Sequence, residues 1–454
     1  MIDERLLVKY NVPVPRYTSY PTVPNWKDDI DVSKWKQTFK CDFITTNGTK
    51  GISLYIHLPF CESLCTYCGC NKKITTNHSI ETEYIQAILK EWQLYLYLMN
   101  EKPVIRELHL GGGTPTFFSP DNLQYLLSQI FASASIHPYH EFSFEGHPNN
   151  TTKAHLELLY KLGFRRVSFG VQDTDLEVQR IINRIQPFEN VQYVTETARS
   201  IGYKSVNFDL IYGLPHQSVE SISRTIKQAI SLRPDRIAFY SYAHVPWSSR
   251  GQRLFDEYDL PSAYEKIKLY QAGEDIFLEN GYHDIGMDHF ALATDDLYKA
   301  SQAGELHRNF MGYTTHNTDV LIGLGVSSIS STGNAFVQNA KTIHNYYNRI
   351  GNSMLAIEKG FFLSGEDRAF GKYILDISCN GKTKFRQEDM DAIDSYCMPE
   401  LIKMEADNLL IIEGDELTIT TQGKNFIRNI CSAFDLYLLK SRINTEKRIY
   451  SNSI

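Results

Sequence analysis

Long apolar runs are missing from this sequence, and their absence excludes a membrane-spanning architecture. No stretch approaches the ~18 consecutive apolar residues of a transmembrane helix, and the start, Met1 to Arg5, lacks the basic and apolar regions of a secretion signal. No stripe of lysine and arginine stands out, and the formal net charge is −7, whereas proteins that bind nucleic acid are usually basic. We therefore expect a cytoplasmic protein with no membrane span and no nucleic-acid partner.

Cysteine is scarce and unevenly placed. The 454 residues include eight cysteines, which make a poor disulfide framework for so long a chain. Four of the eight lie between positions 61 and 70. This distribution agrees with a reducing compartment. It also indicates that residues 61–70 take part in the chemistry of the protein.

The cysteine segment has the composition of a metal-binding loop. Cys61, Cys65 and Cys68 lie within eight residues, and Cys70 follows. Thiolates suit iron–sulfur clusters, and a four-iron cluster held by three of them leaves one iron open to another molecule. The alternative is a structural zinc site, for which Cys70 or His57 would be the fourth ligand.

A glycine loop favours the iron–sulfur interpretation. Residues 107–116 run from an apolar strand into Gly111, Gly112 and Gly113. Glycines allow the backbone to approach a ligand closely, and a zinc site would not need such a loop.

Strand and helix patterns alternate from residue 51 onward, which predicts an α/β fold with a parallel sheet. Six strands are expected at residues 52–57, 104–110, 141–145, 166–171, 205–210 and 236–240, with amphipathic helices at 81–97, 120–132, 153–162, 191–201 and 219–232. This periodicity does not separate a doubly wound sheet from an incomplete barrel. The cysteine loop, the glycine loop and four later residues follow successive strand ends, where parallel α/β folds bind ligands; these residues are Glu145, Gln172, Asp209 and Ala243.

The ends of the chain differ from this central region. Residues 1–50 contain several prolines and few periodic apolar positions, so we expect an N-terminal arm laid across a catalytic region at 51–350. Residues 351–454 predict a smaller, mainly helical domain with a hairpin at 408–421 that turns at Gly414. This domain could resemble a winged helix, with a structural or substrate-covering role rather than DNA binding.

Several motifs, taken in order, carry a family resemblance. The cysteine and glycine loops resemble the radical S-adenosylmethionine (SAM) enzymes, and the full series resembles the oxygen-independent coproporphyrinogen III dehydrogenases of anaerobic haem biosynthesis. The motifs span Pro15–Thr22, Tyr55–Cys61, Cys68–Lys72, Phe169–Asp173, Asp209–Pro215, Gly286–Phe290, His307–Phe310, Gly312–Thr315 and Arg428–Cys431. The resemblance implies a curved, partial (βα)6 barrel that is open at one side.

The resemblance also implies cofactors and their ligands. Cys61, Cys65 and Cys68 would ligate a [4Fe–4S] cluster, and SAM would chelate the open iron. The residues matching the first SAM site are Tyr55, Gly112, Glu145 and Ile329. A second SAM site is expected at Tyr67, Gly113, Thr114, Gln172, Arg184, Asp209 and Ala243.

Cys70 is interpreted separately from the three ligands. Cysteines two residues apart rarely bind one small cluster together, so Cys70 is expected beside the cluster, near substrate or Tyr67, and both are predicted to take part in catalysis. His57 is expected to face the barrel interior with Tyr55, in a supporting or electron-path role. The remaining cysteines are interpreted as structural: Cys41, Cys379, Cys397 and Cys431.

Two positions depart from the family pattern. Tyr67 replaces a common phenylalanine, and its added hydroxyl needs a partner if it is buried. His147, in Gly146-His-Pro148, is expected to alter the local charge near Glu145. Weaker candidates for holding substrate propionates are Lys72, Lys73, Arg16, His289, His307 and Arg308.

The implied reaction is oxidative decarboxylation of two propionates of coproporphyrinogen III to vinyl groups, giving protoporphyrinogen IX. It needs a low-potential electron donor such as flavodoxin or ferredoxin, and an electron acceptor that the sequence does not identify. Family habit implies a monomer. The alternatives are a haem-binding delivery protein and a haem-degrading radical SAM enzyme; Cys70 and the Pro15–Thr22 motif weigh against the first, and the motif less decisively against the second.

Overall fold

A twelve-stranded mixed sheet organises the chain, in the order β16-β15-β14-β13-β1-β4-β5-β6-β7-β8-β10-β9. The computed structural model describes residues 4–247, 249–441 and 450. All six predicted strands are present and parallel, although the third begins six residues earlier than expected. They are β1 (Ile52–Leu58), β4 (Val104–Gly112), β5 (Ser135–Gly146), β6 (Arg166–Gln172), β7 (Ser205–Tyr212) and β8 (Arg236–Ser241).

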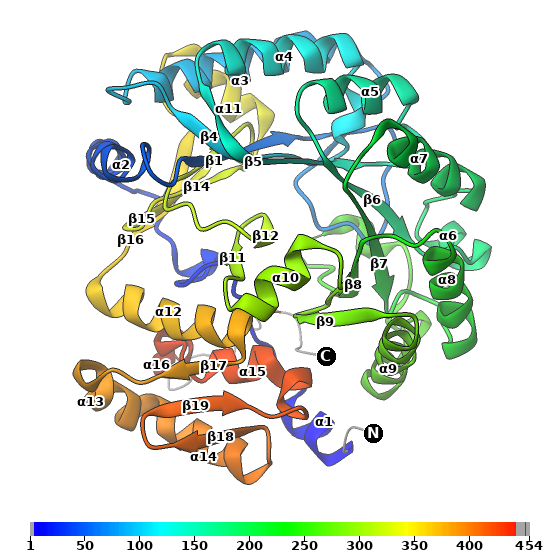
Figure 1. Cartoon of the computed structure of the whole chain (residues 1–454), viewed down its shortest axis with the longest axis vertical. Helices are drawn as coiled ribbons and strands as arrows, with labels where there is room; N and C mark the ends of the chain where they lie inside the picture. Colours follow the sequence, from blue (N-terminus) through cyan, green and yellow to red (C-terminus); the bar gives the residue numbers. More distant parts are fainter. Residues whose placement is uncertain (1–3, 248, 442–449, 451–454) are drawn as a thin grey trace.

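Helices cover the outer face of the curved sheet, as Figure 1 shows. The five predicted helices are present as α3 (Ile80–Leu96), α4 (Pro120–Ala132), α5 (Lys153–Lys161), α7 (Phe188–Ile201) and α8 (Val219–Ser231). A short helix, α6 (Leu176–Ile181), lies between α5 and α7 in the sequence. Hydroxyl side chains cap three of them: Ser119 caps α4, Thr152 caps α5 and Ser218 caps α8. Such caps satisfy backbone N–H groups that a helix start leaves without partners.

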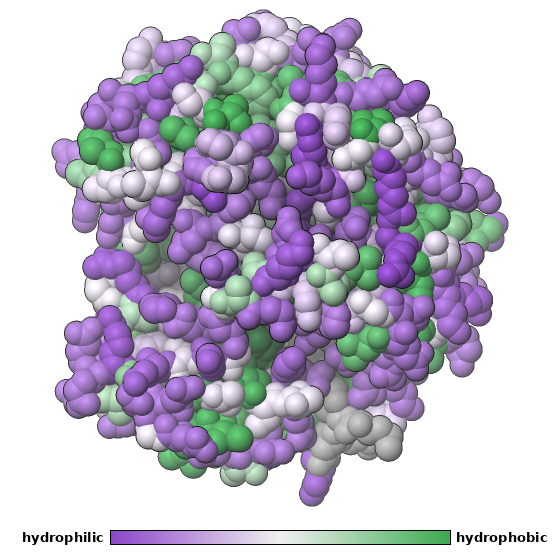
Figure 2. Space-filling model, viewed as in Figure 1, coloured by the Kyte–Doolittle hydropathy of each residue, from purple (hydrophilic) through white to green (hydrophobic). Residues whose placement is uncertain are grey.

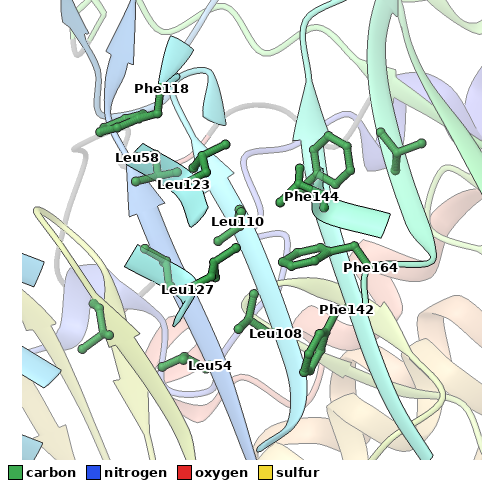
Figure 3. Packing of buried hydrophobic residues seen from close by; sticks show 14 of the residues in the cluster. Leu54, Leu58, Leu108, Leu110, Phe118, Leu123, Leu127, Phe142, Phe144 and Phe164 are labelled. Atoms are coloured by element: carbon green, nitrogen blue, oxygen red, sulfur yellow. The ribbon is translucent and has the colours of Figure 1, made fainter. Parts of the chain in front are cut away.

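The main core fills the space between the sheet and these helices. Leucines of β1 and β4 and phenylalanines of β5 pack against leucines of α4 (Figure 3). Leu54, Leu110, Phe144 and Leu127 are fully buried there. Burial of this kind stabilises by about 1.5–3 kcal/mol per large side chain, so the core holds the strand ends in fixed register.

The sheet continues beyond the six predicted strands on both sides. β13 (Leu321–Leu324) pairs in parallel with β1, and β14 (Ile329–Ser331), β15 (Ala335–Asn339) and β16 (Ile357–Phe362) follow as antiparallel strands. On the other side, β10 (His289–Leu292) is antiparallel to β8, and β9 (Tyr282–Gly286) is antiparallel to β10. Smaller pairs are β2 (Phe60–Cys61) with β3 (Lys73–Ile74), and β11 (His307–Asn309) with β12 (Gly312–Thr314). The associated helices are α9 (Ala263–Glu279), α10 (Asp296–Ala303) and α11 (Ile343–Gly351).

The N-terminal segment contains two helices that the sequence interpretation did not predict. α1 (Glu4–Tyr10) contributes Leu6 and Leu7 to a hydrophobic cluster of the C-terminal region. α2 (Val32–Thr46) packs its fully buried aromatic residues, Trp35, Phe39 and Phe43, into the main core. Between the two helices, residues 11–31 are largely irregular and join the two hydrophobic regions.

The C-terminal region forms its own hydrophobic cluster below the barrel in Figure 1. The predicted hairpin is confirmed as β18 (Leu410–Glu413) and β19 (Glu416–Ile419), and β17 (Lys382–Lys384) adds a third strand. The helices are α12 (Gly365–Asn380), α13 (Met390–Ala392), a π-helical segment (Ile393–Cys397), α14 (Met398–Ala406), α15 (Ile427–Ser432) and α16 (Leu436–Ser441). Short 3-10 helices occur at Val23–Asn25, Pro115–Phe117, Arg250–Arg253, Glu257–Asp259, Gln387–Asp389 and Gly423–Phe426.

The surface agrees with the composition of the chain. The face seen in Figure 2 is mostly hydrophilic, with apolar residues in small separate groups. None of the helices in the described ranges combines the length and the apolar character that crossing a membrane requires.

Candidate active site

The cysteine loop and the glycine loop are joined at the carboxyl end of the sheet. Gly113 donates its backbone N–H to the Leu58 carbonyl (2.9 Å), and Thr114 donates to the Phe60 carbonyl (3.0 Å). The Thr114 hydroxyl donates to the Cys61 sulfur at 3.3 Å. The first predicted cluster ligand is therefore fixed by the loop that was predicted to bind SAM.

Arg184 anchors the middle of the cysteine loop. Its Nη1 lies 3.6 Å from the Cys65 sulfur, and its Nη2 donates to the Gly170 carbonyl at 2.6 Å. The Nε atom is buried and has no hydrogen-bond partner. A buried donor without a partner costs about 1–3 kcal/mol, so this atom points to an anionic or carbonyl group that completes the site.

Cys70 lies beside Cys68, as the sequence predicted for a thiol adjacent to the ligand set. A hydrogen bond between the two thiols lowers the pKa of Cys68 to about 6. Lys72 donates its ammonium to the backbone carbonyls of Cys68 (2.9 Å) and Cys70 (3.4 Å). Lys72 therefore supports the loop backbone.

The glycine loop leaves no room for side chains. An added Cβ at Gly111 would lie 3.1 Å from the Glu145 carboxylate, and one at Gly112 would lie 2.7 Å from the His57 ring. At Gly113 the same atom would lie 2.6 Å from the backbone of Pro59. Gly112 also has φ = +118°, a conformation that L-residues rarely adopt. The loop is thus a backbone cradle between the cysteine loop and Glu145.

Glu145, at the end of β5, is oriented by two donors. The Gly112 N–H donates to its carboxylate at 3.1 Å, and the His109 ring lies 3.4 Å from the other oxygen. Burial opposes ionisation, but the hydrogen bond and the charge of His109 outweigh it and lower the pKa of Glu145. Glu145 therefore presents a carboxylate suited to an ammonium group.

Tyr55 and His57 share one face of β1, as strand alternation predicted. Burial lowers the pKa of His57, so its ring is neutral. Its Nε2 donates to the Asn71 carbonyl at 2.9 Å, which leaves Nδ1 to accept from the Tyr55 hydroxyl at 3.1 Å. The Tyr55 ring stacks on His109, with ring centres 5.9 Å apart. His57 thus connects Tyr55, which is predicted to bind the first SAM, to the chain that follows the cysteine loop.

Gln172 is the last residue of β6, and Asp209 lies within the neighbouring strand β7. Ser168 donates to Asp209 at 2.9 Å and Asn207 donates at 2.8 Å. Burial, together with the nearby charge of Glu145, raises the pKa of Asp209 to about 6. Gln172 has φ = +66°, so it turns the chain sharply out of β6.

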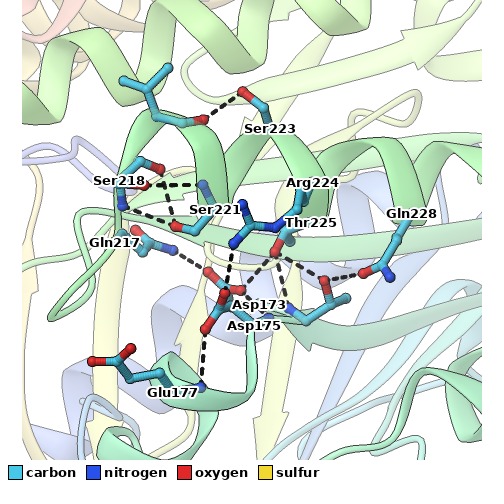
Figure 4. A network of polar contacts seen from close by, with 12 residues as sticks. Asp173, Asp175, Glu177, Gln217, Ser218, Ser221, Ser223, Arg224, Thr225 and Gln228 are labelled. Atoms are coloured by element: carbon cyan, nitrogen blue, oxygen red, sulfur yellow. Dashed lines mark hydrogen bonds and ion pairs between the residues drawn. The ribbon is translucent and has the colours of Figure 1, made fainter.

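A polar network holds this turn in place (Figure 4). Asp173 is buried and accepts hydrogen bonds from the side chains of Gln217 (2.6 Å) and Thr225 (2.7 Å). It also accepts from the backbone N–H of Asp175 at 2.7 Å. The network ties the end of β6 to α6 and α8, and it holds the residue that follows Gln172.

Tyr67, Ala243 and Ile329 come from three separate segments. Gln252 donates to the backbone carbonyls of Tyr67 (2.9 Å) and Ala243 (3.2 Å), so one amide joins two predicted residues of the second SAM site. The backbone of Ile329 lies against Gly323, which pairs with Tyr55. Ile329 is thereby joined to Tyr55, with which it was predicted to bind the first SAM, through a strand that was not predicted from the sequence.

His147 carries no charge in this setting. Burial and the neighbouring charge of Arg184 lower its pKa to about 2. A buried imidazole next to a guanidinium stays neutral, so His147 adds no positive charge beside Glu145, and its effect on the site stays a prediction.

The three thiols are not arranged like the ligands of one metal ion. Within residues 4–247, 249–441 and 450, no group of three or more His, Cys, Asp or Glu side chains could hold such an ion.

Comparisons with known proteins agree on one family. Residues 55–229 match the radical SAM superfamily. The oxygen-independent coproporphyrinogen III oxidase of Pseudomonas aeruginosa is 37% identical over 444 residues, 96% of each chain. That of Escherichia coli is 35% identical over 459 residues, 98% of each chain.

The chain belongs to the oxygen-independent coproporphyrinogen III oxidase family. A solved structure, described as the radical SAM coproporphyrinogen III oxidase of Escherichia coli, superposes with a TM-score of 0.89 at 34% identity, covering 96% of this chain and 100% of that one. The family resemblance and the partial-barrel fold drawn from the sequence are confirmed.

Membership of the radical SAM superfamily brings a [4Fe–4S] cluster and SAM, and the site fits both. Three thiols project from one loop, the glycine cradle excludes any Cβ, and Arg184 carries a buried Nε donor with no protein partner. The assignment of individual residues to the cluster and to each SAM stays a prediction.

Three residues that hold the predicted site residues in place were not predicted from the sequence: His109, Asn207 and Gln252. His109 and Asn207 each lie two residues before a residue that was identified, on the same strand face, so alternation could have revealed them. Gln252 lies in an irregular segment, and no sequence pattern marks it.

Proposed function

We propose that this protein oxidatively decarboxylates two propionates of coproporphyrinogen III to vinyl groups and so forms protoporphyrinogen IX. The observation that carries the proposal is the similarity to curated enzymes of that name along nearly the whole chain, 96–99% of it for the first four relatives. The active-site loops, the barrel and the C-terminal region are all included in that match.

The cluster and SAM, when bound, supply the 5′-deoxyadenosyl radical that removes hydrogen from the propionate β-carbon. The chain's own residues position these groups. Glu145 would accept from the ammonium group of the first SAM, and Gly112 would bring its backbone against it. Arg184, with its unused Nε donor, would bind the carboxylate of a second SAM, and Asp209 would accept from its ammonium or ribose hydroxyl.

Cys70 and Tyr67 are proposed to act at the substrate. The Cys70 thiol lies close enough to influence the pKa of Tyr55 and Tyr67, beside Cys68 and outside the three-thiol set. This position would allow proton or hydrogen transfer near the reacting propionate without loss of the cluster.

We also propose a compartment, an oligomeric state and electron-transfer partners for the enzyme. All eight cysteines are free, which is consistent with a reducing cytoplasm. We propose a monomer that receives electrons from a low-potential donor such as flavodoxin or ferredoxin and passes one to a separate acceptor for each propionate. The haem-delivery and haem-degrading alternatives receive no support from the matched relatives.

An anaerobic turnover assay tests the proposal. Protein reconstituted with iron and sulfide is incubated with SAM, a reductant and coproporphyrinogen III, and protoporphyrin and 5′-deoxyadenosine are quantified after oxidation. We expect both products. Tight haem binding without loss of any propionate would contradict the proposal.

A further inference from the structure

A large cavity lies outside the barrel interior. It has a volume of about 880 Å³ and is lined by α9, β9, the N-terminal segment and the C-terminal region. Small-molecule sites usually measure about 300–1,000 Å³. A smaller cavity of about 220 Å³ lies inside the barrel and contains Glu145 and Asp209. Tyr240 lines both, so one side chain stands between the SAM end of the barrel and the outer cavity.

Arginines gather at the Tyr240 end of the outer cavity. Arg16 lies 5.9 Å from the centre of the Tyr240 ring and donates to the Ser241 carbonyl at 2.9 Å. Arg308 donates to the Arg16 carbonyl at 2.7 Å. Arg428, at the same wall, donates to the Val14 carbonyl at 2.6 Å. Each of the three guanidinium groups thus donates to a neutral backbone carbonyl at the junction of the barrel and the N-terminal segment.

Arg308 is not neutralised by a carboxylate. It forms no ion pair within the described part of the chain, and its buried Nε has no hydrogen-bond partner. Arg16 has one acidic neighbour, Asp288, at 3.6 Å. Among the other acidic side chains that line the cavity, Asp284 lies 3.5 Å from Lys424 and Asp376 lies 2.9 Å from Lys372. Glu274 and Glu416 line it as well.

The positive charges of these arginines lower the pKa of the cationic side chains next to them. Burial, and then the charges of Arg16 and Arg428, lower the pKa of Lys266 to about 8, although Asp288 opposes the shift. Burial and Arg16 likewise lower the pKa of Arg428 to about 10. This end of the cavity therefore has a positive potential that an anionic occupant would relieve.

We propose that Arg16 and Arg308, with Lys266 and Arg428 beside them, bind the two propionates that the tetrapyrrole retains through the reaction. This inference rests on the proposed function. The reacting propionates must reach the Glu145 and Asp209 end of the barrel, and the retained ones project from the opposite rim of the macrocycle. A ring placed along Tyr240 would present one rim to each end. Carboxylates could then accept from the unused donor of Arg308 as charge-assisted hydrogen bonds.

The alternative is that the arginines only fasten the N-terminal segment to the barrel. A matched control is Arg165, whose guanidinium donates to the Tyr160 and Phe164 carbonyls at 2.6 and 2.8 Å and does not line the cavity. If the arginines only fasten the N-terminal segment, Arg308→Gln and Arg165→Gln should both lose stability and both keep their affinity for substrate.

The experiment compares these variants in the reconstituted holoenzyme. KM for coproporphyrinogen III and the affinity for protoporphyrin IX, which keeps only the two retained propionates, are measured for wild type, Arg308→Gln, Arg308→Lys and Arg165→Gln. We expect Arg308→Gln to raise KM about ten- to a hundred-fold with kcat at saturation little changed, and to weaken protoporphyrin IX binding by the same factor. Arg308→Lys should recover part of both losses. The dimethyl ester of protoporphyrin IX should bind weakly to every variant.

Two results would overturn the inference. One is an unchanged KM in Arg308→Gln; the other is a raised KM with unchanged affinity for protoporphyrin IX, because the cations would then hold the reacting propionates. Arg16→Gln repeats the test if Arg308→Gln does not fold. A wild-type protein that forms no protoporphyrinogen would contradict the proposed reaction, and porphyrin binding would still decide the role of the cavity.

Discussion

Replacing Gly112 with alanine perturbs the active site at one atom. The new Cβ would meet the His57 ring at 2.7 Å, in a backbone with φ = +118°. A conformation with positive φ costs an L-residue about 1–2 kcal/mol. His57 is held by hydrogen bonds to Asn71 and Tyr55, and moving the ring aside gives up one of them, at about 1 kcal/mol. In the alanine variant the native conformation of the loop is therefore about 2–3 kcal/mol less stable than a relaxed conformation that avoids this strain.

SAM must restore that conformation in order to bind, so the same free energy is subtracted from its affinity. At about 1.4 kcal/mol per tenfold, Gly112→Ala should weaken SAM binding roughly thirty- to a hundred-fold. The assay is the change in the electron paramagnetic resonance spectrum of the reduced cluster as SAM is added. Gly281→Ala is the control, because its φ is +82° and nothing lies within 4 Å of the added Cβ. Equal SAM affinity in Gly112→Ala and Gly281→Ala would refute the interpretation of the glycine loop as a backbone cradle for SAM.

Three further predictions concern single side chains. Cys70→Ser should retain the visible absorption of the cluster and lose decarboxylation; normal turnover would make Cys70 a structural thiol. Burial raises the pKa of Glu91 to about 7 from 4.5, so the folded state holds this proton more tightly than the unfolded state. Stability should therefore fall by about 3 kcal/mol as the pH rises from about 4.5 to above 7. Urea midpoints should lose this component in Glu91→Gln, and an identical slope in the variant would contradict it. The pKa of Lys266 is lowered to about 8, so kcat/KM for coproporphyrinogen III should decline above pH 8; Lys266→Arg, which keeps its charge, should move the decline to higher pH.

The parallel strands and their helices could be predicted from the sequence because their signals are local. Apolar strand segments alternate with amphipathic helices, and residues that follow successive parallel strands must meet at one edge of the sheet. This reasoning placed Glu145 and Asp209 together, and both line the cavity inside the barrel. The missed helix α2 also had a local signal, since Trp35, Phe39 and Phe43 recur at helical spacing after the Asp31 cap.

The remaining features depend on contacts between distant parts of the chain. β13 is four residues long and contains a glycine, and it becomes a strand because it pairs with β1. Similarly, Arg16, Arg308 and Arg428 are far apart in the sequence, and the packing of the N-terminal and C-terminal segments against the barrel brings them to one cavity. Arg16 and Arg308 were predicted from the sequence as candidates for holding propionates, but no local pattern indicates that they share a cavity with Arg428.

The origin of the hydrogen atom in the nucleoside product tests the central claim most directly. Coproporphyrinogen III carrying deuterium at the propionate β-carbons would be turned over anaerobically, and the 5′-deoxyadenosine would be analysed by mass spectrometry. The account predicts one deuterium in each 5′-deoxyadenosine formed with a vinyl group. Nucleoside without deuterium, formed while vinyl groups appear, would contradict hydrogen abstraction from the propionate in this site.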